Sequence, residues 1–156
     1  MDQAERAYET GCLLGIPTGW VRLDELICGW EPDKRYLVAA RPGAGKTSLA
    51  MNIAERVAMD GGNFVGVISL EMSAEDLILR LACSRARVNF HKLRTGCPTQ
   101  REQEKLKAGF PKVINTKIIL DDAGGLTMHE VRSRLRGMVH RYGVKLAIVD
   151  YLQLIS

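Results

Sequence analysis

Short apolar runs alternate with longer amphipathic segments along the chain, and this alternation predicts its secondary structure. Four continuous runs of mainly aliphatic residues predict buried strands, at residues 36–39, 64–70, 117–120 and 146–150. Between these runs, apolar residues recur every three or four positions, which is typical of helices packed on one face. The predicted helices follow Lys46, Ser73, Thr99 and Thr127, with shorter ones at residues 2–10 and 21–27 and irregular chain from Asn89 to Pro98.

Capping patterns mark the starts of three predicted helices. Thr99 and Thr127 are each followed, three residues later, by a glutamate. In that spacing the side chains of the two residues bond to each other's backbone N–H groups. Ser73 is followed by Asp76 at the same spacing, which resembles this capping box with a shorter acid. Gly143 is expected to end the last helix, because glycine readily adopts the left-handed conformation found there.

Strands that alternate with helices predict a parallel sheet covered by helices on both faces. A continuous apolar run is typical of a strand that is buried on both sides, as parallel strands are. In such sheets, ligands bind beyond the carboxyl ends of the strands. Polar residues stand at these ends: Glu71, Asp121, Asp122 and Asp150. We therefore expect an α/β fold of three layers, α/β/α, with its functional site along this edge.

The first predicted strand leads into the most specific motif of the chain, residues 40–48. A strand, a glycine-containing loop and Gly-Lys-Thr at the start of a helix form the P-loop arrangement. Glycines let backbone N–H groups approach a polyphosphate, and the helix N-terminus adds further donors. Lys46 is expected to reach the β- and γ-phosphates, and the Thr47 hydroxyl to ligate Mg²⁺. The predicted nucleotide-binding residues are Arg41, Pro42, Gly43, Ala44, Gly45, Lys46, Thr47 and Ser48.

One position departs from the usual P-loop pattern. Ala40 stands where the pattern commonly has glycine, and we interpret it as a variant. The competing interpretation is a glycine-rich turn before a helix, with Lys46 in solvent. The strand and helix predicted on either side favour the P-loop.

A nucleotide hydrolase also needs a carboxylate that holds Mg²⁺ at the end of an apolar strand. Two positions fit, the pair Asp121–Asp122 and the single Asp150. The strand before Asp150 is the more apolar and favours it without excluding the pair. Glu71 has two interpretations. It could orient or deprotonate an attacking water, or it could simply be an exposed acid that is favourable before a helix N-terminus.

Composition and charge narrow the class of protein. The 156 residues are 46% hydrophobic and 26% charged, as in one globular domain with its own core. The net charge of +4 permits nucleic-acid binding without favouring it. No apolar run reaches membrane-spanning length, and the four cysteines lack zinc-site spacing. Because the first residues contain no apolar stretch, we expect no secretory signal. Most of a group of helix arginines are expected to form solvated surface: Arg80, Arg85, Arg87, Arg132, Arg134, Arg136 and Arg141.

Several short segments together resemble one known family. They are Gly15–Trp20, Leu23–Leu26, Ala39–Thr47, Ser69–Ser73, Leu93–Gly96, Asp121–Asp122 with Leu126–Thr127, and Asp150–Leu154. In identity and order they resemble the C-terminal motor domain of the DnaB-type replicative DNA helicases. Ser-Leu-Glu-Met-Ser and Asp-Tyr-Leu-Gln-Leu are the most specific of these segments, and the resemblance extends over residues 11–156.

The resemblance implies a RecA-like P-loop ATPase fold with a mostly parallel sheet, truncated after the Walker B strand. It implies ATP and Mg²⁺ as cofactors and gives roles to three residues. Lys46 and Glu71 match the catalytic positions, and Asp150 matches the Walker B aspartate that, with Thr47, holds the metal. Asp121 and Asp122 are then expected to have structural roles and not to hold the metal. Ala40 matches the family's own P-loop variant.

The resemblance also implies an organisation and a set of partners. Residues 1–14 correspond to the end of a linker helix and a link, and residues 15–156 to the N-terminal part of the RecA-like ATPase domain. The implied partners are ATP, single-stranded DNA, further copies in a hexamer, a primase and a helicase loader, in the cytoplasm of a bacterium or as a phage protein there. The alternatives are a RecA- or RadA-like recombination ATPase and a non-catalytic module that regulates a helicase ring.

Overall fold

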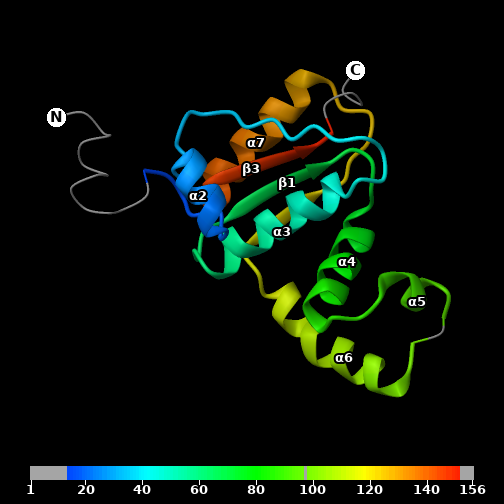
Figure 1. Cartoon of the computed structure of the whole chain (residues 1–156). Coiled ribbons are helices and arrows are strands. Elements are labelled where there is room, and N and C mark those ends of the chain that lie inside the picture. The colour runs from blue at the N-terminus through cyan, green and yellow to red at the C-terminus, as the bar shows by residue number, and fades with distance from the viewer. Residues whose placement is uncertain (1–13, 97, 152–156) are drawn as a thin grey trace.

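The computed structural model describes residues 14–96 and 98–151 (Figure 1). Its helices are α2 (Val21–Ile27), α3 (Lys46–Met59), α4 (Ala74–Ala86), α5 (Phe90–Arg94), α6 (Gln100–Ile114) and α7 (Met128–Tyr142). Its strands are β1 (Val65–Ser69), β2 (Ile118–Asp121) and β3 (Leu146–Asp150). The helix predicted at residues 2–10, and with it the expected linker-helix end, lies outside the described residues.

The three strands form one parallel sheet in the order β2-β1-β3. β1 is central, with Val65 opposite Ile118 of β2 and Leu146 of β3, and all five of its residues are buried. All three carboxyl ends therefore lie at one edge of the sheet, near the beginning of α3 (Figure 1). The prediction of a parallel sheet is confirmed for these three of the four expected strands.

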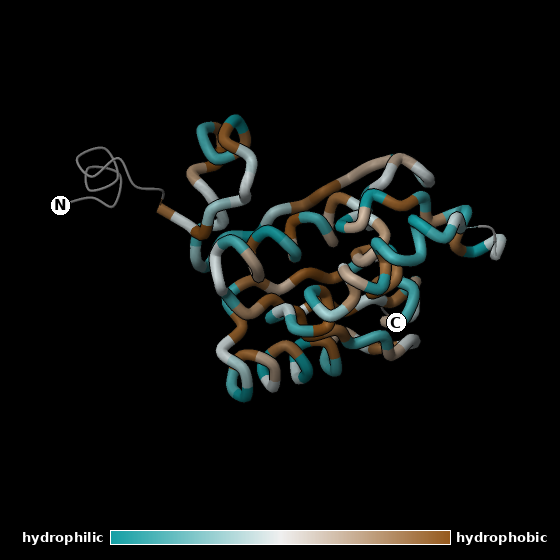
Figure 2. Tube along the Cα trace, turned by 90° about the horizontal axis from the view of Figure 1, so that it is seen from below, coloured by the Kyte–Doolittle hydropathy of each residue, from teal (hydrophilic) through white to brown (hydrophobic). Residues whose placement is uncertain are grey.

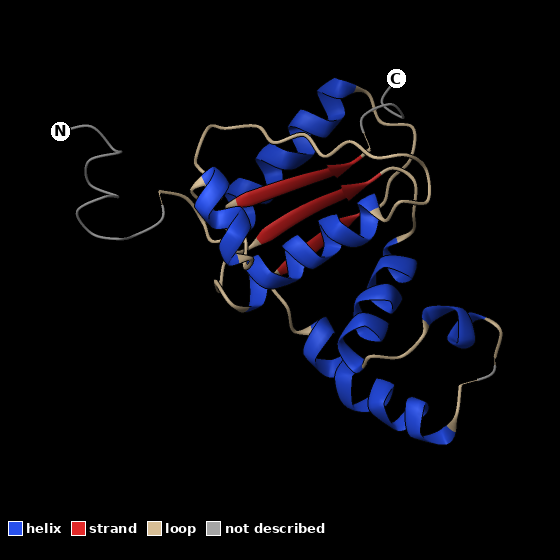
Figure 3. Cartoon of the chain, viewed as in Figure 1, coloured by secondary structure: helices blue, strands red, loops and turns tan. Residues whose placement is uncertain are grey.

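Alternating side chains of β1 divide the core into two parts. Val65 and Val67 belong to the cluster that includes α3 and α4, whereas Ile68 packs with the cluster that includes α7. Successive strand side chains point to opposite faces, so α3 and α7 cover opposite sides of the sheet and three layers result (Figure 3). Gly66 permits this close packing, because a Cβ there would lie 2.9 Å from Met138 Sδ. Hydrophobic positions follow the strands through the middle of the molecule (Figure 2).

The strand predicted at residues 36–39 is wrong. This segment runs as a loop across the molecule (Figure 3), and residue Leu37 is 83% exposed. Tyr36 is held locally, because its hydroxyl donates to the Gly29 carbonyl at 3.1 Å and its ring packs edge-on against Trp30. A buried parallel strand needs a partner along its length, and no described strand pairs with this segment.

The predicted helix ends agree with the structure in most places. Thr99 and Thr127 each form the complete capping box, and Gly143 ends α7 with φ 70°. Ser73 accepts a hydrogen bond from the Asp76 N–H, but the reciprocal bond is absent from the described contacts, because aspartate is one carbon shorter than glutamate.

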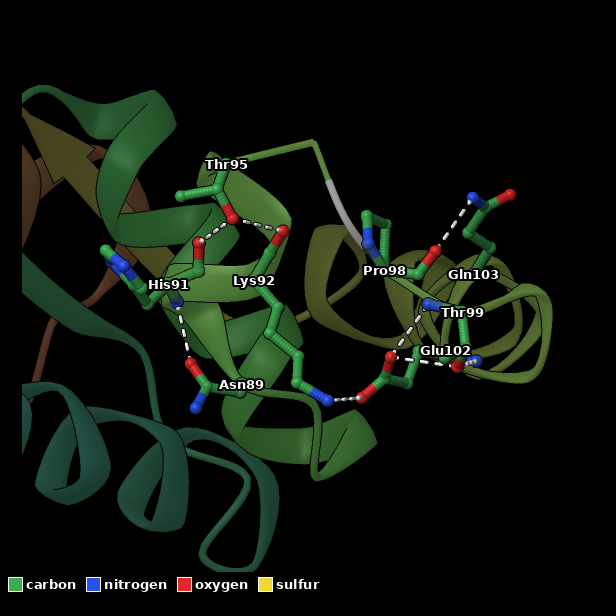
Figure 4. A network of polar contacts seen from close by, with 8 residues as sticks. All are labelled: Asn89, His91, Lys92, Thr95, Pro98, Thr99, Glu102 and Gln103. Carbon is green, nitrogen blue, oxygen red and sulfur yellow. Dashed lines mark hydrogen bonds and ion pairs between the residues drawn. The ribbon is translucent and has the colours of Figure 1, made fainter.

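Among its described residues, the segment predicted to be irregular from Asn89 to Pro98 is partly helical. It contains the short helix α5, which begins where the Asn89 side chain accepts a hydrogen bond from the His91 N–H at 2.8 Å. Figure 4 shows how this helix is tied to α6, through the ion pair of Lys92 with Glu102 at 3.4 Å. Helices α4, α5 and α6 thus form a group beside the sheet (Figure 1).

Candidate nucleotide-binding site

The loop before α3 has the backbone shape expected of a P-loop. Gly43 and Gly45 have φ of 77° and 93°, a region that glycine adopts without steric cost. A Cβ at either position would meet no atom within 4 Å, so the backbone here is open to an incoming group. No side chain caps the first turn of α3, and that turn contains no acidic residue. Its N–H groups therefore remain available to an anion.

Three predicted site residues lie together at the carboxyl end of β3. Thr47 Oγ1 donates a hydrogen bond to Asp150 Oδ2 at 2.6 Å, and Lys46 Nζ lies 3.9 Å from Asp150 Oδ1. The ammonium group also lies 4.1 Å from the centre of the Tyr151 ring. Asp150 is only 5% exposed, and a carboxylate so buried needs a charged or hydrogen-bonding partner. The P-loop and the tip of β3 therefore form one polar cluster.

The oxygen atoms of this cluster fit a magnesium ion. Mg²⁺ is a hard cation that prefers oxygen ligands and commonly binds through one or two protein oxygens together with phosphates and water. Thr47 offers a hydroxyl and Asp150 a carboxylate, aimed at each other beside the phosphate-binding loop. Within residues 14–96 and 98–151, no group of three or more His, Cys, Asp or Glu side chains forms an independent metal site.

Glu71 lies in the turn that follows β1, close along the chain to a residue of β1 that pairs with Asp150. Ser69 pairs with Asp150 across the sheet and is 2% exposed. Its hydroxyl donates to the Met72 carbonyl at 2.7 Å and accepts from the Met72 N–H at 3.2 Å. This pair of bonds closes the turn around Glu71, which is exposed. The turn thus carries a carboxylate at the same sheet edge as Lys46.

The other candidate carboxylates have structural contacts. Arg134 Nη1 donates to both oxygens of Asp121 at 2.7 Å, and this contact raises the pKa of Arg134. Asp122 accepts a hydrogen bond from the Ala74 N–H at 2.8 Å, at the start of α4. Both lie at the end of β2, which β1 separates from β3. The structure does not bring this pair to Lys46 and Thr47.

The residue-level predictions missed Ser69 and Tyr151 as parts of the site. Each directly flanks a predicted position along the sequence, Ser69 two residues before Glu71 and Tyr151 just after Asp150. Their contacts, however, depend on which strands are neighbours. Most of the helix arginines lie on exposed surface, as expected, and only Arg80 and Arg134 are half-buried. Arg85 pairs with Glu55 at 2.7 Å, and the Arg80 guanidinium stacks 4.7 Å from the Phe90 ring centre.

A glycine-containing loop before a helix, facing a buried aspartate at the tip of a parallel strand, defines an α/β protein of the P-loop class. The comparison with known families makes this more specific. The family model described as "DnaB-like helicase C terminal domain" matches residues 15–156, and the chain belongs to this family. The resemblance stated from the short sequence segments is thereby confirmed.

Known relatives agree with this family. The chain is 39% identical over 146 residues to a protein of Bacillus subtilis (strain 168) named "Replicative DNA helicase DnaC". It is 37% identical over 146 residues to "Replicative DNA helicase DnaB" of Geobacillus stearothermophilus. Each alignment covers 94% of this chain and 32% of the relative. The chain therefore spans about a third of the length of the curated relatives it matches.

Two solved structures share the fold. One, described as an ATPase domain, superposes with a TM-score of 0.86 at 28% identity, covering 98% of this chain and 55% of that one. The other, "The Structure Of A DnaB-Like Replicative Helicase And Its Interactions With Primase", gives 0.88 at 27% identity, covering 98% and 38%. The predicted RecA-like α/β class is confirmed by this similarity. Among the described residues, no helix is both long and apolar enough to cross a membrane.

Proposed function

We propose that the chain is the ATP-binding part of a replicative DNA helicase motor, in which ATP hydrolysis drives movement along single-stranded DNA and duplex unwinding. The observation that supports this most strongly is the cluster of Lys46, Thr47 and Asp150. A cation, a hydroxyl and a buried carboxylate converge there beside an uncapped helix N-terminus. These are the groups needed to hold a triphosphate with its metal.

Each residue of the cluster has a distinct role in this proposal. Backbone N–H groups of residues 41–48 and the Lys46 ammonium hold the β- and γ-phosphates, where they offset negative charge. The Thr47 hydroxyl would be a ligand of Mg²⁺, and Asp150 would hold the ion through water. When bound, the ion supplies neutralisation of charge that develops on the phosphate oxygens.

Glu71 is proposed as the residue that orients the attacking water and accepts its proton. A general base must lie within hydrogen-bond reach of that water once substrate is bound. Its place in the turn after β1, two residues beyond the Ser69 that pairs with Asp150, supports this role. The exposed position leaves the carboxylate free to turn toward the phosphate.

The partners follow from the family and are part of the same proposal. They are single-stranded DNA, further copies of the chain in a hexamer, a primase and a helicase loader, in the bacterial cytoplasm. One solved relative is described together with its interactions with primase. The division into a linker end at residues 1–14 and an ATPase segment at residues 15–156 belongs to this proposal as well.

Turnover by the chain itself tests the proposal. We further propose that a neighbouring subunit of the hexamer supplies a cation that stabilises the transition state, so that the site is shared between two subunits. The chain alone is then expected to bind Mg²⁺–ATP and to hydrolyse it slowly. Such a cation in trans is worth roughly 10³–10⁵-fold in rate. Phosphate release would be measured with the chain at concentrations where light scattering shows a monomer. Rapid turnover by that monomer would contradict the proposed shared site.

A further inference from the structure

The ammonium group of Lys46 lies between two different kinds of partner. Its Nζ atom is 3.9 Å from Asp150 Oδ1, which is the limit of an ion pair and too long for a hydrogen bond. The same atom lies 4.1 Å from the centre of the Tyr151 ring, which is within the range of a cation–π contact. The proposed roles use Asp150 but give no function to Tyr151.

The Asp150 carboxylate attracts Lys46 without being its hydrogen-bond partner. Thr47 Oγ1 donates to Asp150 Oδ2 at 2.6 Å, and Oδ1 is the oxygen nearest the ammonium group. A carboxylate in direct contact with Lys46 would compete with a phosphate for the same cation. At the observed distance, the N–H groups of Lys46 are not committed to Asp150.

The Tyr151 ring supplies attraction of another kind. The face of an aromatic ring is electron-rich, so it attracts a cation although the ring carries no net charge. The Lys46 side chain is only 29% exposed, and such contacts are stronger when the cation has lost part of its water. An uncharged ring does not compete with an anion as a second carboxylate would. It can therefore hold the lysine while the N–H groups remain available to phosphate oxygens.

We propose that Tyr151 is a positioning residue, whose ring holds the Lys46 ammonium group at the P-loop ready for the phosphates. This inference rests on the proposed nucleotide-binding function and adds a residue to it. A lysine side chain has many rotamers, and fixing it on binding costs free energy. A ring that restricts this side chain in the empty site lowers that cost. Tyr151 directly follows β3, so the strand that supplies Asp150 also supplies the ring.

Calorimetric titration with Mg²⁺–ATP and with Mg²⁺–tripolyphosphate tests this role. Tyr151→Leu removes the ring but keeps an apolar side chain, and we expect both affinities to fall by the same factor, roughly three- to tenfold. Tyr151→Phe keeps the ring face and should stay within about twofold of the unchanged chain for both probes. Tyr142→Leu removes a tyrosine that is 40% exposed at the end of α7. It is the matched control and should change neither affinity.

A double-mutant cycle with Lys46→Ala shows whether the ring acts through the lysine. If it does, Tyr151→Leu should cause no further loss of affinity for either probe in the Lys46→Ala chain. The loss in Tyr151→Leu should also persist for tripolyphosphate in EDTA, because the contact between lysine and phosphate does not need the metal. A full additional loss in the Lys46→Ala chain, or a loss seen only with Mg²⁺, would overturn the proposal.

The remaining outcomes are equally decisive. No loss in Tyr151→Leu, a loss for ATP alone, or an equal loss in Tyr151→Phe would overturn the role of the ring, while weaker binding in Lys46→Ala leaves the P-loop assignment standing. If Tyr151→Leu does not keep the circular dichroism spectrum of the unchanged chain, Tyr151→Met, which also lacks a ring, takes its place. Failure of the unchanged chain to bind either probe would refute both proposals.

Discussion

At the scale of single residues, the site depends on a buried carboxylate with few partners. Asp150 is almost fully enclosed, accepts a short hydrogen bond from Thr47 and has Lys46 at the edge of ion-pair distance. Burying such a charge is unfavourable unless cations or donors surround it. The buried Asp150 carboxylate is therefore suited to binding a metal ion, which would add a strong positive charge beside it.

Asp150→Asn separates this metal role from a structural one. The amide oxygen can still accept the Thr47 hydrogen bond, so we expect the fold to be kept, but the negative charge that favours a cation is lost. The affinity for ATP in Mg²⁺ should fall roughly tenfold, whereas the affinity in EDTA should stay equal or rise. Equilibrium titration under both conditions measures this. An unchanged enhancement of binding by Mg²⁺ would show that Asp150 does not hold the ion.

At the scale of elements, helix ends are specified by the sequence itself. Thr127 and Glu130 bond reciprocally at the start of α7, with Glu130 Oε2 accepting from the Thr127 N–H at 2.8 Å and its hydroxyl at 2.7 Å. These bonds favour the charged acid and lower the pKa of Glu130. A lowered pKa in the folded state stabilises the fold above the ordinary carboxyl pKa, and this contribution is lost as pH falls through the folded value.

Glu130→Gln should therefore have a pH-dependent effect. We expect its melting temperature to lie below that of the unchanged chain at pH 7, with a difference that shrinks as the pH falls below roughly 4. Thermal unfolding followed by circular dichroism across this range gives the comparison. Glu104→Gln, at an exposed position of α6, removes the same charge as a control. A difference that stayed constant with pH would contradict the capping account.

The link before the P-loop provides a second prediction at this scale. Gly15 and Ile16 run against Trp30 in a short antiparallel bridge. A Cβ at Gly15 would lie 2.6 Å from the Glu31 nitrogen and closer still to the Trp30 carbonyl. Because backbone atoms cannot move aside easily, Gly15→Ala should lower the free energy of unfolding by about 1–3 kcal/mol. In Gly137→Ala, a helical position with open space, urea unfolding should instead show a gain of about 0.5–1 kcal/mol.

Elements that local sequence patterns specify could be predicted, whereas elements that depend on contacts distant in the sequence could not. The capping threonines and the strands at Val65, Ile118 and Leu146 are marked by local spacing, so the sequence located them well. The segment at residues 36–39 has the same apolar character, but a strand also needs an edge to pair with, and local pattern does not contain that. The short helix α5 begins with a single Asn89 cap, which is too weak a signal to predict from sequence.

At the scale of the whole molecule, the site lies where two layers and the sheet edge meet. The P-loop leads into α3 on one face, β3 brings Asp150 and β1 brings Glu71. Thr47 and Asp150 are 103 residues apart in sequence, so only the strand order decides that they touch. Because sequence spacing does not give the strand order, Asp121–Asp122 remained a second candidate for the carboxylate that holds Mg²⁺. Placing β1 between β2 and β3 keeps that pair away from the P-loop.

The binding of Mg²⁺–ATP to Lys46→Ala tests the central claim most directly. If the loop ending in Lys46 and Thr47 holds the triphosphate, the dissociation constant should rise roughly tenfold or more, with an unchanged circular dichroism spectrum. Lys145→Ala, an exposed lysine just before β3, should bind as the unchanged chain does. Undiminished affinity in Lys46→Ala would contradict the account.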